Sequence, residues 1–157
     1  MHTKSSKINF LTAQLCTSRA KGQIINGLEK VRQTYEARGF KIVAVHGDNE
    51  FDMEAVKTFL SPAMVHIYGK DEHDAVSERS IRTVKESSRT MTHSTPYRRV
   101  PKIMVIALVG CSILWLNAFP SIGGVSEFMS PSTIVEGKPK PDMNTKKIAY
   151  GSYAMVL

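Results

Sequence analysis

The stretch KIVAVHGDNEF, residues 41–51, contains the pattern that decides the expected fold. Its first part, Lys41 to His46, is a continuous run rich in β-branched residues, which is typical of a strand covered on both faces. The run leads directly into Gly47, Asp48 and Asn49, which are turn-forming residues. The pattern therefore predicts a buried strand with Asp48 at its carboxyl end.

A helix and a second strand are predicted next along the chain. Apolar residues between Glu50 and Leu60 recur at helical spacing, and Pro62 separates them from a short strand pattern, Met64 to Tyr68. Two strands joined through a helix normally pair in parallel, because the connection has to cross over the sheet. We therefore expect an α/β fold.

One strand and one helix are predicted upstream of this unit. Ile8 to Leu15 has the mixed apolar and threonine-bearing pattern of a strand. From Gln23 to Ala37 the apolar residues recur at spacings of four, three and four, which indicates an amphipathic helix that Gly39 ends. Residues Met1 to Lys7 are polar, and we expect them to form a tail.

Two long helices are predicted downstream. The first, from about Glu72 to Met91, is mostly polar and has only a narrow packing stripe. The second, Ile103 to Phe119, is almost wholly apolar. A membrane-spanning helix needs about 20 apolar residues, so a central buried helix is favoured over the alternative of a membrane-associated protein. The packing stripe of the first helix consists of Ile81, Val84, Ser88 and Met91.

Composition limits the classes of protein to which the chain can belong. Its 157 residues, 42% of them apolar and 22% charged, are typical of one globular domain, 1–157, with a C-terminal extension at 138–157 that ends in a strand pattern, Ile148 to Val156. The formal charge of +7 favours polyanionic partners such as nucleic acid or acidic lipid. Cys16 and Cys111 lack zinc-site spacing, which supports neither a disulfide framework nor a zinc module. We expect an intracellular protein without a secretion signal.

Two carboxylates are candidate metal ligands. Asp48 is expected at a strand end, and Glu78 one turn into the first long helix. In α/β sheets, ligands bind at the carboxyl ends of the strands. Carboxylate oxygens are preferred ligands of Mg²⁺ and Mn²⁺. Two such ions, about 4 Å apart, promote the displacement of a phosphoryl group. The alternative is that Asp48 only caps a turn and that Glu78 is one of many solvated helix acids.

A basic stripe follows Glu78 on the same helix. Arg82, Lys85 and Arg89 come four, three and four residues further along and therefore share one face with it. Such a face can hold nucleic-acid phosphates, giving salt-dependent affinity without sequence specificity. The alternative is a solvated helix face that pairs locally with Glu78 and Glu86.

Three histidines lie close to these residues in the sequence. His46 and His66 belong to the two predicted strands, and His73 lies near the start of the long helix. Histidines in such positions are mostly structural, although His73 has a place suited to a phosphate or a metal-bound water. We assign none of the three as a metal ligand.

Four segments together resemble a known family. They are GDNEF at 47–51, EHDAVSERSIRTVKE at 72–86, WLNAFP at 115–120 and GGVSEFMSPSTIVEGKP at 123–139. In this order and spacing they resemble the integrase region of copia-type retrotransposon polyproteins, over about Phe10 to Val156. The resemblance implies an RNase H-like fold of the DDE superfamily, a mixed five-stranded sheet flanked by helices, which cuts and joins DNA with a metal-bound acidic triad.

The resemblance also implies roles for individual residues. Asp48 matches the second aspartate of the family and Glu78 its glutamate, so both are expected to hold Mg²⁺ or Mn²⁺ and to act in catalysis. Arg79 follows the glutamate as in relatives. Trp115 and Asn117 are expected to support the fold from the helix behind the sheet. The residues expected to bind nucleic acid are Arg79, Arg82, Lys85 and Arg89.

One departure from the family pattern is decisive. The family's first aspartate lies on an earlier strand of the sheet, and this chain has no Asp before Asp48. We therefore expect a partial integrase core, truncated before its first strand and inactive alone, which in the intact family acts on DNA as a multimer, in the nucleus. The alternative is a non-catalytic, basic nucleic-acid-binding remnant.

Overall fold

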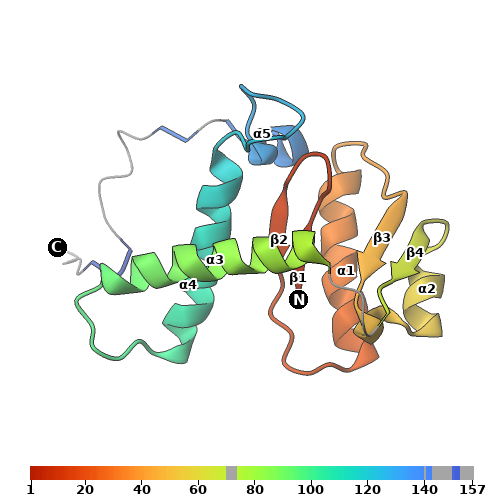
Figure 1. Ribbon diagram of the computed structural model, residues 1–157, viewed down its shortest axis with the longest axis horizontal. Coiled ribbons are helices and arrows are strands. Elements are labelled where there is room, and N and C mark those ends of the chain that lie inside the picture. Colours follow the sequence, from red (N-terminus) through yellow and green to blue (C-terminus); the bar gives the residue numbers. More distant parts are fainter. Residues whose placement is uncertain (70–73, 140, 143–149, 153–157) are drawn as a thin grey trace.

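The computed structural model describes residues 1–69, 74–139, 141–142 and 150–152. Short strands and helices alternate in the first half of this part of the chain, and the second half is helical (Figure 1). In chain order the elements are β1 (His2–Lys4), β2 (Leu11–Ala13), α1 (Lys21–Glu36), β3 (Ala44–Gly47), a 3₁₀ turn (Asn49–Phe51), α2 (Glu54–Leu60), β4 (Met64–Ile67), α3 (Ala75–His93), α4 (Lys102–Ala118) and α5 (Pro131–Glu136).

The strands form two small sheets. β1 and β2 pair antiparallel, and β3 and β4 pair in parallel through the crossover helix α2. The predicted strand, helix and parallel strand are therefore confirmed. In the part of the chain that the structure describes, these two pairs stay separate, whereas the sequence led us to expect one mixed sheet.

The prediction that the strand before Asp48 is buried on both faces is wrong. β3 begins only at Ala44, and along it exposed residues alternate with half-buried ones. Val45 points into the core formed by α1 and α2, whereas Ala44 and His46 lie on the opposite, exposed face. A two-stranded sheet with helices on one side only leaves its other face in solvent. The core cluster that covers the inner face consists of Ile24, Leu28, Val56 and Leu60.

The N-terminal residues form a hairpin instead of the expected polar tail. β1 pairs with β2, and the Nε2 atom of His2 lies 2.9 Å from the hydroxyl of Ser80 on α3. The predicted strand from Ile8 to Leu15 is present but shorter, as β2. A polar segment of three residues has no periodicity long enough to indicate a strand, so β1 could not be predicted.

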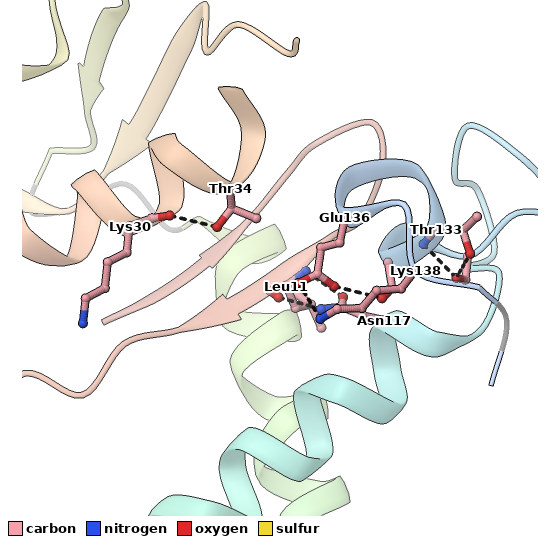
Figure 2. Close-up of polar contacts among 9 residues, drawn as sticks. Leu11, Lys30, Thr34, Asn117, Thr133, Glu136 and Lys138 are labelled. Carbon is pink, nitrogen blue, oxygen red and sulfur yellow. Dashed lines mark hydrogen bonds and ion pairs between the residues drawn. The ribbon is translucent and has the colours of Figure 1, made fainter. Parts of the chain in front are cut away.

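Asn117 supports the fold by pairing with β2. Its side-chain amide accepts a hydrogen bond from the Leu11 N–H at 2.8 Å and donates one to the Leu11 carbonyl at 2.7 Å (Figure 2). Asn117 is only 4% exposed, so these two backbone groups have no access to bulk water through this side. The amide completes the edge of β2 that faces away from β1.

The two long helices cross each other (Figure 1). Where they meet, the hydroxyls of Ser88 on α3 and Ser112 on α4 lie 2.9 Å apart, and Val84 packs with Ile113 and Leu11. Within the predicted stripe of α3, Val84 is buried but Ile81 stays 38% exposed.

The prediction that Ile103 to Phe119 forms a central buried helix is wrong for one side of α4. One face of α4 is buried, including Leu108 and Asn117, but Ile103 is 72% and Leu114 is 60% exposed. In the described part of the chain, no helix is long and apolar enough to cross a membrane. Most of the predicted strand Ile148 to Val156 lies outside the described residues.

Candidate metal and nucleic-acid site

Asp48 stands at the carboxyl end of β3, as predicted. It precedes the 3₁₀ turn, and its Oδ1 atom accepts a hydrogen bond of 2.7 Å from the backbone N–H of Asn49. The residue is exposed. Asp48 therefore does cap a turn, as the alternative reading held, and its carboxylate is also accessible from solvent.

Other residues of the GDNEF segment hold this turn in place. The ring of Phe51 packs so closely on Gly47 that a Cβ atom at position 47 would lie 3.0 Å from it. Glu50 forms an ion pair of 2.8 Å with Arg19, from the loop before α1. Glycine and phenylalanine in this segment therefore fix the direction in which the chain leaves the strand.

A second carboxylate, Asp74, stands at the start of α3. Asp74 caps the helix by accepting hydrogen bonds from the N–H groups of Val76 and Ser77, each 3.1 Å long, and from the Ser77 hydroxyl. Partial burial alone would raise the pKa of Asp74, but these hydrogen bonds, together with the positive charge of His46, hold it below its ordinary value. Asp74 therefore fixes the first turn of α3 through its carboxylate.

Glu78 follows one turn further along α3. Its backbone N–H bonds to the Asp74 carbonyl at 3.0 Å, and its side chain is exposed. Asp48 thus follows β3, and Glu78 lies in the first turn of α3. Their sharing of one metal ion stays a prediction.

The donor set for a metal centre is incomplete in this part of the protein. Among residues 1–69, 74–139, 141–142 and 150–152, no group of three or more His, Cys, Asp or Glu side chains could hold a metal ion. Two carboxylates are too few to fix a pair of Mg²⁺ ions. The described residues alone therefore do not fit a two-ion centre.

The basic stripe is exposed along α3. Arg79, Arg82, Lys85 and Arg89 all have exposed side chains. At about 100° per residue, Arg82, Lys85 and Arg89 share a face with Glu78, while Arg79 lies about a quarter turn away. Ion pairs of the described side chains are found on other elements: Arg19–Glu50, Arg32–Glu29, Arg32–Glu36, Lys57–Asp52 and Lys138–Glu136.

An open groove adjoins the far end of the stripe. It has a volume of about 400 Å³ and lies between α3, α4 and the hairpin. Lys85 and Arg89 stand at its margin, and its floor is apolar, with Leu108 and Val109 from α4. The stripe therefore runs from the strand ends, along α3, to this groove.

Sequence reasoning missed the arrangement of two of the histidines. The rings of His46 and His66 stack, with centroids 4.9 Å apart, on the exposed face of the β3–β4 pair. Each histidine is the third residue of its strand, but only the strand register shows that His46 and His66 lie opposite each other. His73 lies outside the described residues.

Comparison with known proteins is informative only at the level of structure. No protein-family model matches the chain, and no curated protein sequence matches it. A solved structure that matches is the catalytic core domain of BIV integrase, with a TM-score of 0.55 and 15% sequence identity, over 87% of this chain and 91% of that one. The chain has an integrase-like fold.

This structural similarity supports the expected fold class but does not test the expected origin or activity. It supports the predicted class, a mixed α/β fold of the integrase-core type. At 15% identity it shows the fold alone, so the copia-type origin, the first-strand truncation and the DNA chemistry need separate tests.

Proposed function

We propose that this chain is a partial integrase catalytic core from a copia-type retrotransposon, and that Asp48 and Glu78 are two of its three metal-binding carboxylates. The observation that supports the proposal is the integrase-like fold, in which an exposed aspartate ends β3 and an exposed glutamate lies in the first turn of the basic helix α3.

The basic stripe supplies the DNA-binding part of the proposal. An exposed row of cations extends along α3 from the turn that carries Glu78. It consists of Arg82, Lys85 and Arg89, and Arg79 adds a fourth cation beside it. Phosphates held along such a row would place a DNA backbone next to the carboxylates. Because backbone contacts release counterions, affinity is expected to fall steeply with salt concentration and to depend little on base sequence.

The missing carboxylate limits what the chain can do alone. In a complete centre, divalent metal ions would activate the attacking oxygen and stabilise the leaving one. Here no Asp precedes Asp48, and the described residues hold no group of three ligands. We therefore expect this chain to bind DNA without joining it, unless a further strand with an aspartate completes the sheet.

Catalytic potential is tested by adding a strand. We would fuse upstream element sequence encoding a strand with an Asp to Met1 and measure Mg²⁺- or Mn²⁺-dependent nicking and strand transfer on labelled DNA ends. Activity that disappears in Asp48→Asn and in Glu78→Gln is the expected result. Activity that survives Asp48→Asn unchanged would contradict the assignment of the site.

The alternative function, a non-catalytic nucleic-acid-binding remnant, is favoured by the same incomplete donor set. It shares the basic stripe with the first proposal, so both predict DNA binding. They differ in the fusion experiment, where a remnant stays inactive. Assembly into multimers and action in the nucleus belong to the first proposal only.

Binding through the stripe is tested by salt titration of the unmodified chain. Lys85→Gln should weaken DNA binding uniformly across sequences and reduce the slope of log affinity against log salt by about 1. Lys7→Gln, an exposed lysine of the hairpin turn, is the matched control and should leave the slope unchanged. Equal slopes for Lys85→Gln and the parent chain would remove Lys85 from the interface.

A further inference from the structure

The exposed face of the β3–β4 pair presents two imidazoles side by side. The strands are parallel and in register, with His46 opposite His66 and Val45 opposite Val65. Alternate residues of a strand point to opposite faces. The valines pack on the α1–α2 core, so the histidines stand together on the solvent side.

The geometry of the two rings suits a shared ligand. Their centroids are 4.9 Å apart and their planes differ by 17°. Neighbouring strands are spaced by about 4.8 Å, so the rings keep the separation of the backbones that carry them. Because both side chains are exposed, rotation about their side-chain bonds can turn one nitrogen of each ring toward a single ion without moving the strands.

The surrounding residues favour one orientation of His46. The Tyr68 hydroxyl lies 3.4 Å from Nδ1 of His46, which leaves Nε2 directed elsewhere. The Asp74 carboxylate is near enough to interact with the charge of His46. When Nδ1–H of His46 donates to the Tyr68 oxygen, Nε2 keeps its lone pair for a metal ion, because an acceptor at one ring nitrogen fixes the ring and its tautomer.

From this geometry we propose that His46 and His66 form a binding site for a borderline divalent transition metal such as Zn²⁺. Imidazole nitrogen is a preferred ligand of Zn²⁺, Ni²⁺ and Cu²⁺, whereas Mg²⁺ and Mn²⁺ prefer oxygen. The site thus differs in ion preference from the carboxylates Asp48 and Glu78, and it does not depend on the proposed DNA chemistry. Water molecules would complete the coordination of the ion.

The test is a calorimetric titration of the full chain with zinc chloride in the presence of excess Mg²⁺. One Zn²⁺ should bind per chain, and His46→Gln and His66→Gln should each weaken binding by about tenfold or more. His93→Gln, an exposed histidine in the last turn of α3, is the control and should change nothing. Unchanged affinity in both strand variants, or loss of Zn²⁺ binding in excess Mg²⁺, would overturn the proposal.

A second measurement needs no substitution. In the unmodified chain labelled with ¹⁵N at its histidine rings, Zn²⁺ should shift the ring signals of His46 and His66 together and leave those of His93 in place. A shift confined to one of the two strand histidines, or to neither, would equally overturn the shared site.

Discussion

The β3–β4 pair with its covering helices and the crossed helices α3 and α4 are built differently. The strand pair rests on a cluster of four buried apolar side chains from α1 and α2, and its polar residues all lie on the other face or at the strand ends. The crossed helices share a smaller buried cluster, with a serine–serine hydrogen bond where they meet each other and an asparagine side chain where α4 meets β2. The first region carries Asp48 at a strand end, while the second presents a long cationic face.

The difference shows why the candidate site lies where the two regions touch. Asp74 caps α3 beside His46, and His2 on β1 contacts Ser80 on α3. The second contact joins α3 to the β1–β2 hairpin. The start of α3, which carries Glu78, is thus held by hydrogen bonds of Asp74 and followed by the His2–Ser80 contact.

The largest expected effect comes from the apolar cluster. Leu28→Ala removes a side chain that is 5% exposed and should lower the free energy of unfolding by about 2–5 kcal/mol, because it leaves a cavity. Urea unfolding monitored by circular dichroism measures this loss. Leu15→Ala, at a leucine that is 65% exposed, is the control and should cost far less. Equal losses in the two variants would mean that the cluster does not support the strand pair.

Asn117→Ala should be the next most damaging change, and it acts on the helix region. It leaves the Leu11 N–H and carbonyl without their partner, and an unpaired buried polar group costs about 1–3 kcal/mol. The same urea experiment applies, with Asn26→Ala on the exposed side of α1 as control. A loss no greater than that of the control would contradict the pairing of Asn117 with β2.

Asp74→Ala probes the junction of the two regions. Loss of the helix cap should cost about 1 kcal/mol at neutral pH. The pKa of Asp74 is held below its ordinary value, so the folded state binds fewer protons than the unfolded one near that value. The contribution of Asp74 is therefore fully present above its ordinary pKa and is lost as the pH falls through the lowered one.

Unfolding experiments on the parent chain and on Asp74→Ala, from pH 6 down to the acid range, measure this dependence. The difference in free energy of unfolding between the two chains should change with pH as expected for the protonation of about one carboxyl group. The two stability curves should converge as the pH falls. Curves that stay parallel would show that the cap does not depend on the charge of Asp74.

The smallest expected effect concerns His2. Burial, followed by the charges of the N-terminus and Lys4, lowers the pKa of the His2 imidazole. Its contribution to stability is thus present above the ordinary histidine pKa and decreases as the pH falls through the lowered value. Thermal unfolding of the parent chain and of His2→Gln, which should be less sensitive over this pH range, checks the prediction. Identical pH dependence in the two would contradict it.

Sequence patterns predicted the positions of helices and strands better than their burial and their pairing. The periodicity of α1 and the crossover between β3 and β4 are properties of short segments, and both are confirmed. The burial of β3 was predicted wrongly, because a continuous apolar run does not reveal whether a second layer covers it. β1 was missed because three polar residues become a strand only by pairing with β2.

The same limit applies to the candidate site. Asp48 and Glu78 could be placed at a strand end and in a first helical turn from local pattern alone. The facing of His46 and His66 depends on strand register, and the capping role of Asp74 depends on where α3 begins, and neither follows from spacing. The support from Asn117 was expected only through the resemblance, and the structure gives its physical reason.

The central claim is that Asp48 and Glu78 share one metal position, and paramagnetic broadening by Mn²⁺ tests it most directly. In ¹⁵N-labelled chain, substoichiometric Mn²⁺ should broaden the backbone amide signals of residues 48 and 78 together, and Asp48→Asn should sharply reduce the broadening at residue 78. Broadening at residue 78 that is unaffected by Asp48→Asn would contradict the shared site.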